Sequence, residues 1–129
     1  MVGESLADIA TRDTDPDRAV FSEYHAAGAV TGAFMIRKGR HKLIHYHGFE
    51  DELFDLEADP EELVNLIADS RYKVVLEDLW NELRAVCDPK EVERQAHADQ
   101  RAMVDALGGL EAVRNLGPKG ATPPPAAVG

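Results

Sequence analysis

Residues 33–47 read AFMIRKGRHKLIHYH, and this stretch decides the fold. Residues 33–37 and 42–47 are rich in β-branched and aromatic side chains, which favours two strands. The link Lys38-Gly39-Arg40 is short enough for a hairpin, and Gly39 is suited to the positive φ of a tight turn. The stretch therefore predicts two neighbouring antiparallel strands.

Two further segments extend this hairpin on either side in the sequence. Residues 20–25 are β-branched and aromatic enough for a strand, and the short run 53–56 adds a fourth. Strands that follow one another over such short links favour antiparallel pairing. We therefore expect an α+β fold built on a small antiparallel sheet of about four strands.

A helix is predicted at residues 70–87, because apolar residues recur there at three- and four-residue spacing. This apolar stripe, which we expect to cover the sheet, consists of Tyr72, Val75, Leu76, Leu79, Trp80, Leu83 and Val86.

Two cap-and-proline patterns predict further helix starts. In Asp59-Pro60-Glu61-Glu62, the aspartate caps, the proline suits the first position and Glu62 completes a capping box. Asp88-Pro89 repeats the pattern and predicts a helix over 89–107 that ends at Gly108-Gly109. A helical turn is also expected within residues 5–10.

Composition along the chain predicts three parts. Residues 1–18 form a polar linker, residues 19–116 an α+β subdomain, and residues 117–129 a Pro/Ala-rich tail. The prolines of the tail favour an extended conformation, and both disorder and docking on another surface agree with that pattern.

The charge balance limits the classes of partner. The chain has 129 residues, with 24 acidic and 14 basic residues and a formal net charge of −10. This sign argues against nucleic acid and anionic membranes as partners. Residues 1–5 lack the pattern of a signal peptide and no apolar stretch is long enough for a membrane span, so we expect a cytoplasmic chain. The single cysteine, Cys87, excludes an internal disulfide.

Two patterns resemble metal sites. His41, His45 and His47 lie on one face of a strand, but side chains on one strand point in parallel and do not converge on an ion. The acidic run around Asp55 fails as a calcium loop, because the sixth position holds Pro60 and the twelfth Leu66. We therefore assign no metal ligand.

The segment 52–66, ELFDLEADPEELVNL, resembles the C-terminal signature of the sulfatase family, Glu-Leu-Tyr/Phe-Asp-Leu followed by Asp-Pro-x-Glu and Asn-Leu. Both order and spacing are kept. The same residues suit a structural role, with Asp59 and Asn65 as cap and turn residues. The apolar residues expected in the core are Leu53, Phe54, Leu56, Leu63 and Leu66.

Upstream residues strengthen the resemblance. Residues 22–24 and 35–44 are similar to the strand pair that precedes the signature, and Gly3-Glu4-Ser5-Leu6 is similar to the end of the family's catalytic domain. The resemblance covers residues 3–87, and less securely the following helix and Gly120 to Pro123. It implies a four-stranded antiparallel sheet packed on a long C-terminal helix.

In the sulfatase family, catalysis depends on a formylglycine made within Cys-x-Pro-x-Arg and on a divalent cation such as calcium. Cys87-Asp88-Pro89-Lys90-Glu91 has an anion where the arginine belongs, which would oppose a sulfate ester, and it lies late in the chain. We therefore predict no cofactor in this chain and carry over no catalytic residue. The resemblance implies that Glu23 and His25, at the end of the first strand, lie at the rim of a substrate cleft.

The leading hypothesis is a C-terminal subdomain or fragment of a sulfatase-like hydrolase. It would be structural or accessory, inactive alone, and paired with a sulfatase catalytic domain in the same or another chain. The parent would hydrolyse sulfate esters, or phosphonate or phosphate esters. The alternative is a free-standing module that associates with itself or with another chain. A third hypothesis, a metal-dependent enzyme, rests on the three strand histidines alone.

Overall fold

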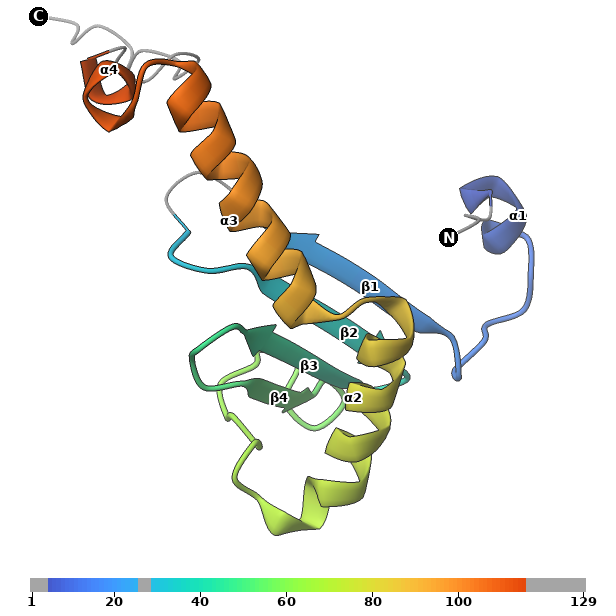
Figure 1. Cartoon of the computed structure of the whole chain (residues 1–129). Helices are drawn as coiled ribbons and strands as arrows, with labels where there is room; N and C mark the ends of the chain where they lie inside the picture. The colour runs from blue at the N-terminus through green and yellow to red at the C-terminus, as the bar shows by residue number, and fades with distance from the viewer. Residues whose placement is uncertain (1–4, 26–28, 116–129) are drawn as a thin grey trace, which may run out of the picture. The chain divides into compact units, whose positions relative to one another are not determined.

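The structure is a computed structural model that describes residues 5–25 and 29–115 (Figure 1). The chain divides into two compact units, residues 1–93 and 94–129. The tail predicted at 117–129 lies outside the described residues, as do Gly3 and Glu4 of the family resemblance.

The predicted hairpin is confirmed. It consists of β2 (Ala33–Lys38) and β3 (His41–Tyr46), paired antiparallel with Ile36 opposite Leu43. Gly39 has φ 56° in the two-residue link, where a side chain would be strained. The hairpin thus fixes the register of the two central strands.

The two flanking strands complete a meander in the order β1-β2-β3-β4. Strand β1 (Ala19–Tyr24) pairs antiparallel with β2, and β4 (Glu52–Asp55) pairs antiparallel with β3. The predicted α+β class with a four-stranded antiparallel sheet is therefore confirmed.

One face of the sheet packs against α2 (Lys73–Val86), which follows a 3-10 turn, η1 (Ser70–Tyr72) (Figure 1). Leu79 and Leu83 of this helix are almost completely buried, and each such side chain stabilises the fold by roughly 2 kcal/mol. The six residues of the buried core are Phe34, Ile36, Leu43, Leu53, Leu79 and Leu83. The predicted stripe on residues 70–87 is confirmed as the cover of the sheet.

The helix predicted to start at Asp59 is wrong. Residues 56–69 contain turns but no helix, and Glu62 has φ 56°, in the left-handed region. The Asp59 carboxylate caps this turn by accepting a hydrogen bond from the Val64 N–H at 2.8 Å. Leu63, predicted in the core, is 81% exposed.

Contacts with the sheet explain why this segment is not helical. The Leu66 N–H donates to the Leu53 carbonyl at 2.8 Å, and Asn65 Oδ1 accepts from the Leu53 and Ile67 N–H groups at 3.0 Å. The Asn65 side-chain amide also donates to the Asp51 carbonyl at 3.1 Å. These bonds hold the chain along β4, which a helix starting at Asp59 would not allow.

Three other helices are described. A short α1 (Leu6–Ala10) confirms the helical turn expected there, and α3 (Pro89–Ala106) lies within one residue of its predicted range. A separate α4 (Leu110–Asn115) follows. Within the described residues, no helix combines the length and apolar character needed to cross a membrane.

Candidate functional site

The two residues predicted at a cleft rim lie at the end of β1. Glu23 is exposed and pairs in register with Phe34. The His25 ring meets the Phe34 ring edge-on, with centroids 5.3 Å apart, and its buried Nε2 has no hydrogen-bond partner in the described part of the chain. Their rim role stays a prediction.

A buried carboxylate holds the chain that returns from His25 to β2. Glu93, only 6% exposed, accepts hydrogen bonds from the Thr31 hydroxyl at 3.1 Å and from the Gly32 N–H at 2.9 Å. A Cβ at Gly32 would lie 2.5 Å from His25 Cε1 and 2.8 Å from Glu93 Oε2. Position 32 therefore has room only for glycine while both side chains keep their places.

The three strand histidines do not converge. The His45 and His47 ring centroids are 6.3 Å apart, whereas the His41 ring contacts Tyr72 at 6.0 Å. His41 Nε2 lies 3.9 Å from Asp55 Oδ2. Across the described ranges, no three His, Cys, Asp or Glu side chains form a group that could hold a metal ion.

Cys87 and Asp88 form the junction between α2 and α3. Cys87 is the C-cap of α2, and Asp88 Oδ1 accepts from the Lys90 N–H at 3.1 Å and the Glu91 N–H at 3.4 Å. Burial, followed by the nearby charges of Glu23 and Asp88, raises the pKa of the Cys87 thiol. The contacts of Cys87 and Asp88 are those of a helix junction, and Glu91 follows where a formylglycine motif has arginine.

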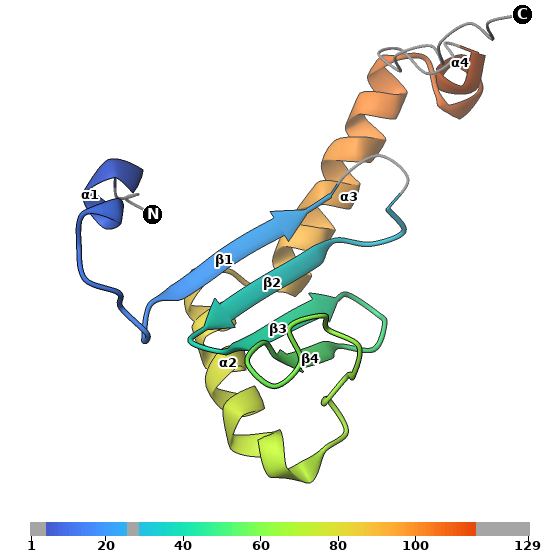
Figure 2. The ribbon, with the colours of Figure 1, turned by 180° about the vertical axis from the view of Figure 1, so that it is seen from behind.

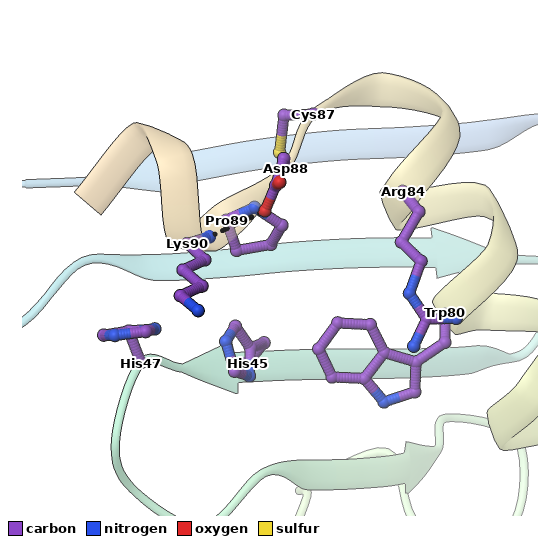
Figure 3. A pocket seen from close by; sticks show the side chains of 8 residues that line it. All are labelled: His45, His47, Trp80, Arg84, Cys87, Asp88, Pro89 and Lys90. Carbon is purple, nitrogen blue, oxygen red and sulfur yellow. Dashed lines mark hydrogen bonds between the residues drawn. The ribbon is translucent and has the colours of Figure 1, made fainter. Parts of the chain in front are cut away.

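A cavity of about 400 Å³ lies beside this junction (Figure 3). His45 and His47 reach it from the end of β3, and Trp80 and Arg84 from α2. The link between α2 and α3 and the first turn of α3 complete it with Cys87, Asp88, Pro89 and Lys90.

Ring contacts and one hydrogen bond hold the wall of this cavity. The His45 and Trp80 rings meet edge-on with centroids 4.8 Å apart, and His45 Nδ1 lies 2.7 Å from Asp51 Oδ1. The Arg84 guanidinium lies over the Trp80 ring, 5.0 Å from its centroid. The cavity therefore combines an aromatic wall with positive charge. The only indication of this cavity in the sequence is the four-residue spacing of Trp80 and Arg84, which places both side chains on one face of the helix.

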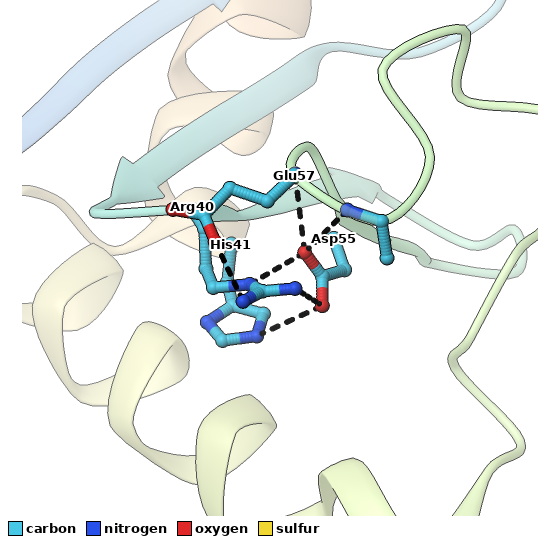
Figure 4. Close-up of polar contacts among 5 residues, drawn as sticks. Arg40, His41, Asp55 and Glu57 are labelled. Atoms are coloured by element: carbon cyan, nitrogen blue, oxygen red, sulfur yellow. Dashed lines mark hydrogen bonds and ion pairs between the residues drawn. The ribbon is translucent and has the colours of Figure 1, made fainter.

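A second polar cluster joins the hairpin turn to β4 (Figure 4). Arg40 binds the buried Asp55 carboxylate through two hydrogen bonds of 2.6 Å and also pairs with Glu57 at 2.6 Å. These bonds lower the pKa of Asp55 to about 2 despite its burial. All of these charges are paired, so the cluster is structural.

The sheet face opposite α2 is only half covered. Residues 56–69 cross it over β3 and β4 (Figure 2), where Phe54 is 6% exposed and Lys42 pairs with Glu62. Over β1 and β2, Val20 is 42% and Tyr24 60% exposed. On the same face, Met35 is half-buried, and Ser22 and Arg37 are exposed. This uncovered half, which we call the open face, exposes the apolar side chains of Val20 and Tyr24 beside Ser22 and Arg37.

Comparison with known proteins identifies the family. Residues 1–93 match the family model described as N-sulphoglucosamine sulphohydrolase, C-terminal. Arylsulfatase K of Rattus norvegicus is 28% identical over 106 residues, which cover 74% of this chain and 18% of that protein. Arylsulfatase K of Danio rerio is 33% identical over 103 residues, which cover 74% of this chain and 19% of that protein.

Solved structures give matches of the same kind. A putative sulfatase from Bacteroides thetaiotaomicron VPI-5482 is 31% identical, with a TM-score of 0.49 over 78% of this chain and 21% of that chain. The phosphonate monoester hydrolase of Agrobacterium radiobacter is 28% identical, with a TM-score of 0.43 over 52% of this chain and 17% of that chain. The family model covers most of the chain, and the chain therefore belongs to the sulfatase family as a C-terminal domain of the N-sulphoglucosamine sulphohydrolase type.

Proposed function

We propose that this chain is a structural, accessory subdomain of a sulfatase-like hydrolase and that it does not hydrolyse sulfate esters alone. Two features support inactivity: Glu91 stands in place of the motif arginine, and Cys87 and Asp88 are the cap residues of a helix junction. The nucleophile and the divalent cation would come from a catalytic domain, in the same or another polypeptide.

The open face is the observation that carries this proposal. Apolar surface of this kind marks contact sites, and surfaces between domains are commonly more polar than obligate subunit interfaces but keep an apolar centre. The chain spans 14–19% of the length of the arylsulfatase K relatives that it matches. The remaining part of such a protein is the partner that we infer for the open face.

The first test is activity. We expect the purified chain to release no nitrocatechol from 4-nitrocatechol sulfate above the rate in buffer, with or without calcium. Hydrolysis that follows the chain through purification and disappears in a Cys87→Ala variant would refute the proposed inactivity.

The second test addresses the open face. The chain should co-purify with a polypeptide of its own genome that carries the Cys-x-Pro-x-Arg motif, and Val20→Lys should weaken this complex by about tenfold or more. Val74→Lys is the matched control, since Val74 lies on α2 and is 77% exposed. Equal binding by both variants would exclude the open face as the contact surface.

The open edge of β1 favours a second candidate, a self-associating module. In the described sheet β1 pairs only with β2, so its outer edge keeps free backbone groups that another strand can bind. Sedimentation of the purified chain separates the two candidates. A concentration-dependent dimer that Val20→Pro abolishes supports self-association, and a monomer at every concentration supports the accessory subdomain.

A further inference from the structure

The cavity at the α2–α3 junction has the features of a small-molecule site that the proposed function does not use. Its volume of about 400 Å³ lies within the range of ligand pockets, about 300–1,000 Å³. All eight lining residues belong to the first unit, residues 1–93.

The aromatic wall of this cavity is held in place by its own contacts. Trp80 meets His45 edge-on at 4.8 Å, and Asp51 holds the other side of the His45 ring through Nδ1 at 2.7 Å. Trp80 stays half-buried, which leaves part of its ring surface accessible. A flat ring can therefore pack here without rearranging the wall.

Two cations border the same space. In Figure 3 the Lys90 ammonium points toward His45 and His47, and the Arg84 guanidinium lies beside Trp80. Within the described residues neither forms an ion pair, whereas Lys38, Arg40, Lys42 and Arg71 all do. In a chain with a net charge of −10, a cavity lined by two cations and the one carboxylate of Asp88 has a local excess of positive charge.

The one acidic group on the cavity wall, Asp88, offsets only one of the two positive charges. Asp88 Oδ1 accepts hydrogen bonds from the backbone N–H groups of Lys90 and Glu91 at the start of α3, at 3.1 and 3.4 Å. The contact between Asp88 and Lys90 in the described chain is to the backbone N–H, so the ammonium of Lys90 remains available to a ligand.

We propose that this cavity binds a small organic anion that carries a flat ring. The ring packs on the wall formed by Trp80 and His45, and the anionic group lies between Arg84 and Lys90. The inference rests on the cavity alone and holds whether or not the chain acts as an accessory subdomain.

Trp80 makes this proposal directly measurable, because it is the chain's single tryptophan. Benzoate and benzenesulfonate should change its fluorescence saturably at millimolar concentrations, the affinity typical of ligands with about ten non-hydrogen atoms. Benzyl alcohol, which keeps the ring, and inorganic sulfate, which keeps the charge, should each bind about tenfold more weakly.

Variants at the two cations test the site itself. Arg84→Gln and Lys90→Gln should each weaken benzoate binding by about tenfold. Lys73→Gln is the matched control, because Lys73 is an exposed lysine at the start of α2 outside the cavity. Protection of Cys87 from alkylation, read by mass spectrometry, gives a second measure that does not depend on fluorescence.

Each outcome decides the proposal. Saturable binding of both ring anions that needs Arg84 and Lys90 and protects Cys87 supports it. Equal binding of inorganic sulfate would indicate a simple anion site and overturn the ring class. Absence of saturable binding, or binding that Lys73→Gln weakens as much as Lys90→Gln, overturns the site.

Discussion

Asp55 joins two parts of the fold through a single carboxylate. It lies at the end of β4, is 4% exposed, and binds Arg40 of the hairpin turn twice at 2.6 Å. The Glu57 and Ala58 N–H groups also donate to its Oδ1 at 3.2 Å. Both carboxylate oxygens are thus hydrogen-bonded, and they join the hairpin turn to the end of β4.

The substitution Asp55→Asn should lower the free energy of unfolding by about 2 kcal/mol at neutral pH, because an amide cannot accept both Arg40 bonds. Hydrogen bonds from Arg40 lower the pKa of Asp55 from 3.8 to about 2 in the folded chain. Its stabilising contribution is therefore full above about pH 4 and is lost as the pH falls toward about 2. Urea unfolding between neutral pH and pH 2 measures both effects.

The exposed substitution Asp13→Asn is the control for this prediction, since Asp13 lies in the N-terminal linker. The difference between wild type and Asp55→Asn should shrink as the pH falls through this window. A difference that stays constant from pH 7 to pH 2 would show that the stabilisation does not come from the ionised carboxylate.

The segment 56–69 is the part of the fold that differs most from its prediction, because it contains turns where a helix was expected. Its turn depends on Asn65, which makes three hydrogen bonds to backbone groups of Asp51, Leu53 and Ile67. Because Leu53 is completely buried, loss of Asn65 leaves a buried N–H without a partner. The element is thus held by the sheet and not by its own helix propensity.

We expect Asn65→Ala to lower the free energy of unfolding by about 2–3 kcal/mol. The control Asn81→Ala, on the exposed side of α2, should change it by less than about 0.5 kcal/mol, since alanine favours helix. Thermal unfolding followed by circular dichroism measures both. A small effect of Asn65→Ala would mean that water replaces these bonds.

Local patterns predicted most of the elements, for physical reasons that differ between them. The two strand-forming runs around Gly39 predicted the hairpin, and the apolar stripe predicted α2. The ends of both strands lie within one residue of their predicted positions, and those of α2 within three. Asp59-Pro60 was misleading because capping signals are local. The competing hydrogen bonds join Asn65 and Leu66 to Leu53 of β4, which lies 12 and 13 residues earlier. A local sequence pattern cannot predict such tertiary contacts.

The same reason limits the prediction of the sites. Cys87 and Asp88 are confirmed as helix-end and cap residues, because capping depends on neighbours in sequence. The cavity went unpredicted, since it joins the end of β3 to residues that lie more than 30 positions later. Only folding brings His45 beside Trp80.

At the scale of the whole molecule, the two units differ in how much of their chain is buried. Among the residues that the structure describes, the buried core lies in the first unit, and none of residues 94–115 is buried. Stability that comes from burial therefore belongs to the first unit. Helical segments without buried side chains open locally at little cost.

Hydrogen exchange should reveal this difference. Amides of β2 and β3 should exchange at least about 100-fold more slowly than those of residues 94–115. Leu83→Ala should speed exchange in the strands, since such a cavity costs about 2–5 kcal/mol, and leave residues 94–115 unchanged. Leu107→Ala, at a half-exposed position, is the control. Equal protection in both units would contradict this division of stability.

The meander order of the sheet has a consequence for how the chain folds. Each strand pairs with the strand next to it in sequence, so no distant segments must meet before the sheet forms. Such low contact order keeps the entropy cost of loop closure small and makes folding fast. During synthesis on the ribosome, the sheet can therefore close on itself as soon as β4 has emerged, without waiting for any other domain.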